Sequence, residues 1–192
     1  MEEKQIGRPR TIDPEAVSLT ALRLFDDSGY DDVSMDDIAA ATGISRRYLF
    51  RLFPNKAALL WGGLDEFIDR LRRSLAADDT ETSAVQALRV AYRDAAAFPA
   101  SVIEVTRHRL RVIHANPGMA GEGAIRVTHL TEEVSAFIST RDRLPPHDFS
   151  AVILSNAFAA AASSALTWWA LESDERPEDV VVRAIDIITA PL

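Results

Sequence analysis

The chain has 192 residues, a formal net charge of -8 and no cysteine. That length is enough to bury a substantial hydrophobic core in one domain or in two small ones. The lack of cysteine excludes disulfides, thiolate metal ligands and cysteine nucleophiles. The acidic balance argues against a broadly basic surface that coats nucleic acid without specificity, so any contact with nucleic acid must be local.

The composition also favours a cytoplasmic protein without a membrane contact. No stretch approaches the roughly 20 uninterrupted apolar residues that a transmembrane helix needs. Residues 1–10 contain no apolar core of the kind found in a signal peptide.

Residues 1–12 are expected to form a flexible basic arm, because the segment Gly7-Arg8-Pro9-Arg10 is polar and has no helical periodicity. A first helix should follow, with Asp13 as its cap and Pro14 at its first position, where a missing N–H costs nothing. Gly29 should end it.

Two short helices around a glycine turn are expected next. Ser34 can cap the first of them, with Asp37 three residues later as a shortened capping box. Gly43 supplies the turn and Ser45 can cap the second helix, which ends at Pro54. Residues 13–56 are therefore predicted to form a helix-turn-helix domain.

The second of these short helices carries an unusual charge pattern. From residue 38 to residue 64 there is no Asp or Glu, although the whole chain is acidic. Leu49 and Phe53 should point inward, and four side chains should point outward: Arg46, Arg47, Tyr48 and Arg51. A run of aspartates at residues 26–37 would repel phosphate, so we expect it to lie away from any bound DNA.

The sequence pattern of the remaining residues, 57–192, predicts helices throughout. A long helix from about Asn55 to Ala76 is expected to be interrupted by the pair Gly62-Gly63, which marks either a soft point or a place of close approach. Further helices are expected at about Ala84 to Phe98, Pro99 to Ala115, Glu122 to Thr140, Asp148 to Leu171 and Pro177 to Thr189. The predicted fold is thus all-α, with about nine helices.

Several motifs in the first sixty residues resemble the TetR family of bacterial transcriptional regulators. They are Leu24-Phe25, Gly29-Tyr30, Ser34 to Ala39, Gly43-Ile44-Ser45 and Phe53-Pro54-Asn55-Lys56. Residues 44–63, the segment Arg107-His108-Arg109-Leu110-Arg111 and the loop Pro145-Pro146-x-Asp148 are similar to an actinobacterial subgroup that includes mycofactocin-associated regulators.

The resemblance implies a homodimer that binds a double-stranded DNA operator, with a helical regulatory domain that binds a small molecule and changes the spacing of the two DNA-binding heads. Arginine on such a helix can bond guanine in the major groove, and helix N-termini can hold phosphates. The expected DNA-binding residues are Ser34, Ser45, Arg46, Arg47, Tyr48, Arg51 and Lys56, with Arg8 and Arg10 reaching an adjacent minor groove. Phe50 and Leu52 replace residues that are hydrogen-bond donors in many members. Arg47 fills a site often held by a small residue, so the operator sequence cannot be transferred from relatives.

The regulatory domain is expected to hold an apolar effector, with an acyl-coenzyme A as one candidate and aromatic or drug-like molecules as others. The predicted pocket residues are Trp61, Phe67, His108, Arg111 and Trp168, although aromatic rings in such a chain more often belong to the core than to a pocket wall. Arg107, Arg109 and Arg111 cannot share one helical face, so one could meet an anionic group or pair with Glu104. The alanine-rich run from Ala157 to Ala165, together with the last helix, suits a dimer seam or a buried helix within one chain.

Two rival classes remain open at this point. A helical-bundle enzyme would need Glu-x-x-His pairs, which the sequence lacks. His108 and His114 are six residues apart, which is a poor spacing for two metal ligands on one helical face, so neither a metal nor a cofactor is expected. The other alternative is an interaction module whose helix-turn-helix binds protein.

Overall fold

The computed structural model describes residues 13–78 and 82–190, so the predicted arm with Arg8 and Arg10 lies outside the described residues. Within these ranges the chain forms nine α-helices, two short 3-10 helices and no strand, which confirms the all-α prediction. The helices are α1 (Pro14–Ser28), α2 (Met35–Thr42), α3 (Arg46–Leu52), α4 (Lys56–Ala77), α5 (Ala84–Ala96), η1 (Ala100–Val102), α6 (Ile103–Ala115), η2 (Pro117–Met119), α7 (Ala120–Arg141), α8 (Phe149–Glu172) and α9 (Pro177–Thr189).

The predicted caps of the first three helices are confirmed. The Asp13 carboxylate accepts from the backbone N–H of Glu15, and the Ser45 hydroxyl accepts from that of Tyr48. At α2 the capping box is complete, because Ser34 accepts from the Asp37 N–H and the Asp37 carboxylate accepts from the Ser34 N–H. Hydrogen bonds from the Ser34 hydroxyl and backbone hold the pKa of Asp37 below its ordinary value.

Gly43 ends α2 in the left-handed conformation, with φ of 67°. No heavy atom lies within 4 Å of a Cβ added there, and the same is true of Gly62 in the middle of α4. The two glycines therefore differ in backbone conformation and not in the space around them.

Alanine at these two positions is expected to change stability in opposite directions. Gly43→Ala should lower the free energy of unfolding by about 1 kcal/mol, because a Cβ disfavours the left-handed region. Gly62→Ala should raise it by about 0.5 to 1 kcal/mol, because alanine loses less backbone freedom in a helix. Urea denaturation of both variants measures the difference, and a loss of stability in Gly62→Ala would show that this site is not the open helical position described here.

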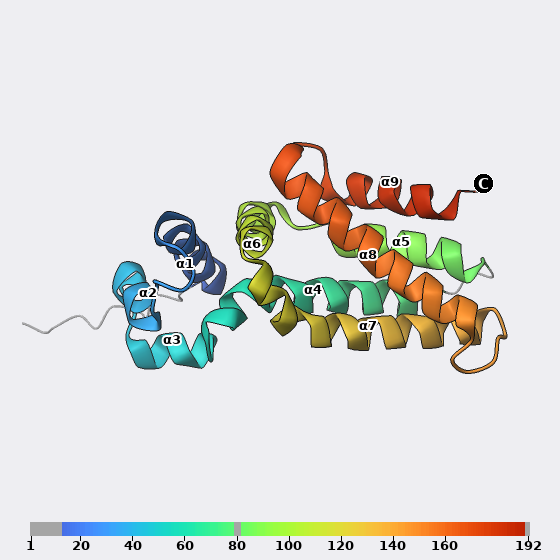
Figure 1. Cartoon of the computed structure of the whole chain (residues 1–192), viewed down its shortest axis with the longest axis horizontal. Helices are drawn as coiled ribbons and strands as arrows, with labels where there is room; N and C mark the ends of the chain where they lie inside the picture. The colour runs from blue at the N-terminus through green and yellow to red at the C-terminus, as the bar shows by residue number, and fades with distance from the viewer. Residues whose placement is uncertain (1–12, 79–81, 191–192) are drawn as a thin grey trace, which may run out of the picture.

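The helices form an elongated molecule with a small head at one end (Figure 1). α1, α2 and α3 make the head, and α4 leads from it into a larger body made of α4, α5, α7, α8 and α9. In the body, α5 packs on α4 and α9, and α8 packs on α7 and α9. α6 lies between the head and the body and contacts both α1 and α8.

Two separate hydrophobic clusters fill this molecule. The body cluster is built around Tyr92, Phe158 and Trp169, all nearly without solvent exposure. The head cluster contains residues of α1, α2 and α3, but it extends into the first turns of α4 and also takes in Val105 and Val112 of α6. The buried core of the head therefore does not end at residue 56.

Three details of the helix prediction need correction. The helix expected from Pro99 to Ala115 is divided, with the 3-10 turn η1 before α6. The helix expected to reach Phe98 ends at Ala96. The glycine pair does not interrupt α4, and an added Cβ at Gly63 would lie 3.2 Å from Nη1 of Arg109, so this glycine is a place of close approach.

α8 is the most apolar helix of the chain that the structure describes. Its length of 24 residues, with a window of 18 residues whose mean hydropathy is 1.5, would allow it to cross a membrane, by length and composition only. In the structure it packs against α6, α7 and α9, as the core helix of a bundle does.

Candidate functional site

α3 presents its arginines to solvent and its apolar side chains to the head. Leu49 is fully buried and Phe53 is 9% exposed, which confirms the predicted inward face. Arg46, Arg47 and Arg51 are exposed. This arrangement follows from the helical repeat, because residues 47 and 51 lie opposite residue 49 around the helix axis, whereas residues 46 and 50 lie at the sides of the helix.

The exposed arginines of α3 differ in their contacts. Arg46 forms an ion pair with Asp36 at 3.1 Å, so Asp36, which was expected to lie away from the DNA, is beside the basic helix. Arg51 stacks over the Tyr48 ring, with 4.4 Å from its guanidinium carbon to the ring centroid. Arg47 is paired with none of the described side chains. Exposed contacts of this kind contribute little free energy in water, so all three arginines are available to bind another partner.

Lys56 stands at the first position of α4 and is held against the head. Its ammonium donates to the Tyr30 carbonyl at 2.6 Å and lies 4.2 Å from the centre of the Tyr30 ring. The hydroxyls of Ser34 and Ser45 are occupied as helix caps, so these two residues would meet DNA as parts of helix N-termini.

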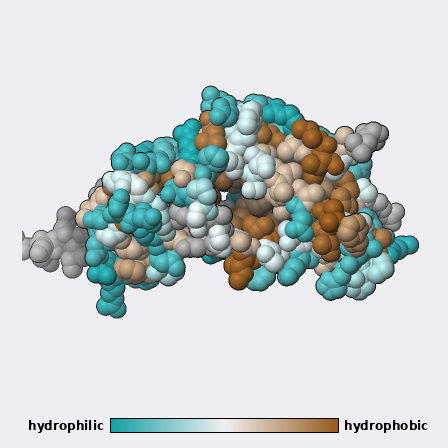
Figure 2. Space-filling view, viewed as in Figure 1, coloured by the Kyte–Doolittle hydropathy of each residue, from teal (hydrophilic) through white to brown (hydrophobic). Residues whose placement is uncertain are grey.

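The body contains an apolar cavity of about 400 Å³ between α4, α6, α7 and α8. Figure 2 shows a hollow in the middle of the face of the molecule that is turned toward the viewer, with hydrophobic side chains beside it. Its walls are formed by Leu60, Trp61, Gly63, Leu64, Phe67, Tyr92, Phe98, Thr106, Arg109, Leu110, Ile113, Val127, Leu130, Thr131, Asn156, Ala159, Ala160, Ala162, Ser163 and Leu166. A cavity of this size and composition suits a small apolar ligand.

Every polar side chain in this wall can donate a hydrogen bond, and none of the described residues that line it is Asp or Glu. The Trp61 indole N–H and the Tyr92 hydroxyl are buried and have no hydrogen-bond partner among the described residues. Burial raises the pKa of Tyr92, so its hydroxyl stays protonated at neutral pH. Arg109, 5% exposed, is the one buried cation among the described wall residues.

Of the five predicted pocket residues, the structure brings Trp61 and Phe67 into this cavity and places the other three outside it. His108 points to the head, where Nδ1 lies 2.9 Å from Asp26. Arg111 donates to the Ala170 carbonyl, and Trp168 is 44% exposed, with the Arg183 guanidinium over its ring.

The wall residues of α6 were missed because the sequence alone does not show which face of this helix meets which neighbour. Thr106, Arg109, Leu110 and Ile113 lie on the cavity side, at the spacing of one helical face. That spacing is a signal that the sequence contains, but it does not by itself distinguish a cavity wall from a helix face packed in the core.

The other two arginines of α6 stabilise the end of α8. Arg107 donates to the carbonyls of Trp169 and Ser173, and Arg111 donates to that of Ala170. Carbonyl groups in the last turn of a helix have no intrahelical donor and carry partial negative charge, so two cations there are favourable.

Three polar pairs join α1 of the head to α6. Arg23 binds Glu104 at 2.6 Å, Asp26 contacts His108, and Glu15 lies 3.0 Å from Arg109. Glu104, which was considered as a partner for the arginines of α6, is thus taken by the head. The third pair is the only one of these in which a residue also lines the cavity.

Comparison with known proteins agrees with this geometry. The family model described as "Bacterial regulatory proteins, tetR family" matches residues 19–60, and the model described as "MftR C-terminal domain" matches residues 82–192. A protein of Mycobacterium tuberculosis, assigned by name to the transcriptional regulation of mycofactocin biosynthesis (MftR), is 30% identical over 190 residues, which are 99% of this chain and 96% of that protein.

The chain belongs to the TetR family. Its likeness to the transcriptional repressor ComR of Escherichia coli is confined to the head, with 38% identity over 68 residues, which are 35% of this chain and 32% of that protein. The resemblance of the C-terminal part to the mycofactocin-associated subgroup, expected from the sequence, is confirmed by the MftR match.

Solved structures show the same TetR-type fold over nearly the whole chain. A TetR-like regulator from Rhodococcus sp. RHA1 aligns with a TM-score of 0.59 at 21% identity, covering 96% of this chain and all of that one. The repressor FadR of Thermus thermophilus, solved with lauroyl-CoA, aligns with a TM-score of 0.53 at 20% identity, covering 92% of this chain and 93% of that one.

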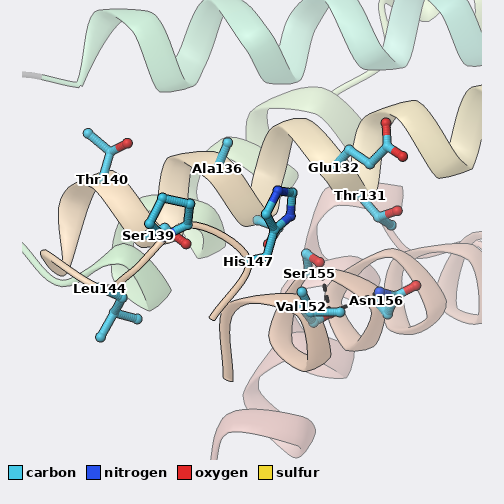
Figure 3. A pocket seen from close by; sticks show the side chains of 12 residues that line it. Thr131, Glu132, Ala136, Ser139, Thr140, Leu144, His147, Val152, Ser155 and Asn156 are labelled. Atoms are coloured by element: carbon cyan, nitrogen blue, oxygen red, sulfur yellow. Dashed lines mark hydrogen bonds between the residues drawn. The ribbon is translucent and has the colours of Figure 1, made fainter. Parts of the chain in front are cut away.

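In this TetR-family chain a second cavity of about 330 Å³ lies between α7, α8 and the loop that joins them (Figure 3). Hydroxyl groups on facing turns of the two helices line it, with His147 of the loop beside them. Thr131 and Asn156 belong to the walls of both cavities. In the described part of the chain, no three side chains of His, Cys, Asp or Glu lie close enough together to hold a metal ion.

α8 and α9 expose several large apolar side chains on the surface of the body. They are Phe149, Val152, Ile153, Trp168, Leu171, Ile187 and Ile188. Brown patches in the right half of Figure 2 show hydrophobic side chains exposed on this face of the body. Exposed apolar side chains gathered on two neighbouring helices are typical of an interface with another protein surface.

Proposed function

We propose that the protein is a ligand-responsive transcriptional repressor that acts in the cytoplasm, binds a palindromic operator as a homodimer, and works by binding and not by catalysis. The observation that supports it best is the basic outer face of α3 in a chain of net charge -8. In this proposal Arg47 and Arg51 bond base edges in the major groove, while Lys56 and the N-termini of α2 and α3 hold phosphates.

The exposed apolar side chains of α8 and α9 support the homodimer. A two-fold dimer buries the same patch from both protomers, so a self-complementary apolar surface is sufficient. The two heads would then bind half-sites separated by about one helical turn of DNA, roughly 34 to 36 Å, or by a multiple of it.

The cavity supports a small apolar effector. Its walls are mostly aliphatic and aromatic, and α4, which leads to the head, forms one of them. FadR, which shares the fold, was solved with an acyl-coenzyme A, so molecules with an acyl chain are the first to screen. We assign residues 13–56 to DNA binding and residues 57–192 to dimerisation and regulation.

The proposed function is tested by selecting bound DNA from a random library and then titrating the selected fragment at several salt concentrations. Phosphate contacts release counterions, so the affinity should fall steeply and linearly on logarithmic axes as salt rises. Selection of no palindromic sequence, with no salt dependence, would instead support an interaction module that binds protein.

The coupling between effector and DNA is expected to depend on the flexibility of α4 at Gly62. Gly62→Ala stiffens the helix without a clash, whereas Gly63→Ala would press on Arg109. We expect Gly62→Ala to reduce the ratio of operator affinities without and with a saturating effector. This reduction should exceed the change in operator affinity of the effector-free protein and the change in affinity for the effector itself. An unchanged ratio in a stable Gly62→Ala protein would show that bending at this glycine does not carry the signal.

A further inference from the structure

Arg109 touches the cavity, the head and α4 together. It comes from α6 and lines the cavity. Its Nε donates to the Leu59 carbonyl of α4 at 3.1 Å, and its Nη2 lies 3.0 Å from Oε2 of Glu15 in α1. On its other side the guanidinium is close to Gly63, where no side chain separates it from the helix backbone.

The contact between Arg109 and Glu15 is within ion-pair distance but is poorly satisfied. Oε2 of Glu15 is buried and has no hydrogen-bond partner, although the guanidinium is beside it. A buried carboxylate oxygen without a hydrogen bond is unfavourable, whereas a well-aligned pair with arginine would use two parallel N–H groups. Glu15 is also the more exposed partner, with 27% of its side chain accessible against 6% for Arg109. It can therefore return to water more cheaply than the arginine can.

Arg109 itself must keep an anion. Leaving a buried cation unpaired costs several kcal/mol, so Glu15 can leave only if another negative group replaces it. Among the described residues that line the cavity none is acidic, and the buried Trp61 N–H and Tyr92 hydroxyl also lack partners. A ligand with negatively charged acceptor oxygens satisfies these conditions.

We infer that the cavity takes an apolar monocarboxylate, whose carboxylate binds Arg109 in place of Glu15 and thereby releases α1 of the head from α6. This inference rests on the proposed function and names the chemical class of its effector. Exchange of the anion removes one of the three polar pairs between α1 and α6 and leaves Arg109 paired in both states. The ligand thus has the different affinities for the two states that any ligand-driven switch requires.

The class is tested with three probes of equal chain length: dodecanoate, methyl dodecanoate and lauroyl-coenzyme A. Binding is followed by titration calorimetry with the full chain. We expect wild-type protein to bind dodecanoate about tenfold to a hundredfold more tightly than the ester, as a charge-assisted hydrogen-bonded pair implies. Arg109→Gln should bring this ratio close to one. Equal affinity for acid and ester in wild-type protein, or no binding of dodecanoate, would overturn the inference.

Glu15→Gln provides a second test if Arg109→Gln fails to fold. It removes the competing charge with little change in shape, so dodecanoate should bind about tenfold more tightly than to wild type, while affinity for the ester stays the same. Glu104→Gln is the matched control, because Glu104 pairs with Arg23 on the same interface without lining the cavity. The control should leave the acid-to-ester ratio unchanged. Dodecanoate affinity in Glu15→Gln that does not exceed the wild-type value would contradict the exchange.

Failure of this inference is distinguishable from failure of the proposed function. Operator binding by the protein without ligand tests the function and needs no carboxylate. Release of operator by lauroyl-coenzyme A, with no binding of dodecanoate, would overturn the carboxylate assignment and leave the repressor assignment in place. A protein that prefers dodecanoate to its ester but binds no operator would give the reverse result.

Discussion

The double substitution Arg47→Ala, Arg51→Ala is expected to lower operator affinity by about 2 to 6 kcal/mol. Each arginine that bonds a guanine edge is worth about 1 to 3 kcal/mol of discrimination, and the range given is the sum for two arginines with separate base partners. The loss should be specific, so the double variant should also prefer its operator less strongly over unrelated DNA. Fluorescence anisotropy with operator and scrambled fragments measures both quantities.

The control replaces two arginines far from the head, Arg73→Ala and Arg93→Ala, which make the same change in net charge. Both are exposed on α4 and α5. Wild-type operator affinity in the Arg47 and Arg51 double variant would contradict the assignment of α3 as the recognition helix. Lys56→Ala should behave differently, weakening all DNA sequences alike and flattening the salt dependence, because a phosphate contact carries no base information.

Charge on the outer face of α8 is expected to abolish dimerisation and operator binding together. Ala161 is half-buried in one chain and lies within the alanine-rich run, one turn before Ala165 and two turns before Trp168 and Trp169. In a two-fold interface Ala161→Glu would bring two carboxylates into one apolar seam, where unpaired charges are costly. Sedimentation should show a monomer, and a single head should bind an operator fragment only weakly.

Ala124→Glu is the matched control for this substitution, because Ala124 is an exposed residue near the start of α7. It adds the same charge outside the α8 and α9 surface, so it should sediment and bind DNA as wild type does. A dimer with normal operator affinity in Ala161→Glu would place the interface elsewhere on the molecule.

The head could be predicted from sequence nearly to the residue because its signals are local. A capping side chain bonds backbone groups two or three residues away, so Asp13, Ser34 and Ser45 reveal helix starts without any knowledge of the tertiary fold. Gly43 likewise indicates the end of a helix, because it adopts a left-handed backbone conformation that other residues avoid.

The cavity could be predicted only in part, because its walls depend on how distant helices face one another. The two pocket residues that were predicted correctly, Trp61 and Phe67, both lie on α4. On α6 the polar residues His108 and Arg111 were chosen for their chemistry, yet Asp26 and the end of α8 are their partners. The glycine pair shows the same limit, since only packing distinguishes Gly63, beside Arg109, from Gly62, beside nothing.

The sharing of α6 between head and body bears on what counts as a folding unit. Leu59 and Leu60 of α4, with Val105 and Val112 of α6, are buried members of the head cluster. A fragment ending near residue 60 would therefore leave an apolar surface open to water where α6 belongs. The packing unit at this end of the molecule is therefore discontinuous in sequence. It consists of residues 13–60 and residues 102–113, and the segment between them belongs to the body. Any event that displaces α6 also changes the stability of the head itself, in addition to its position.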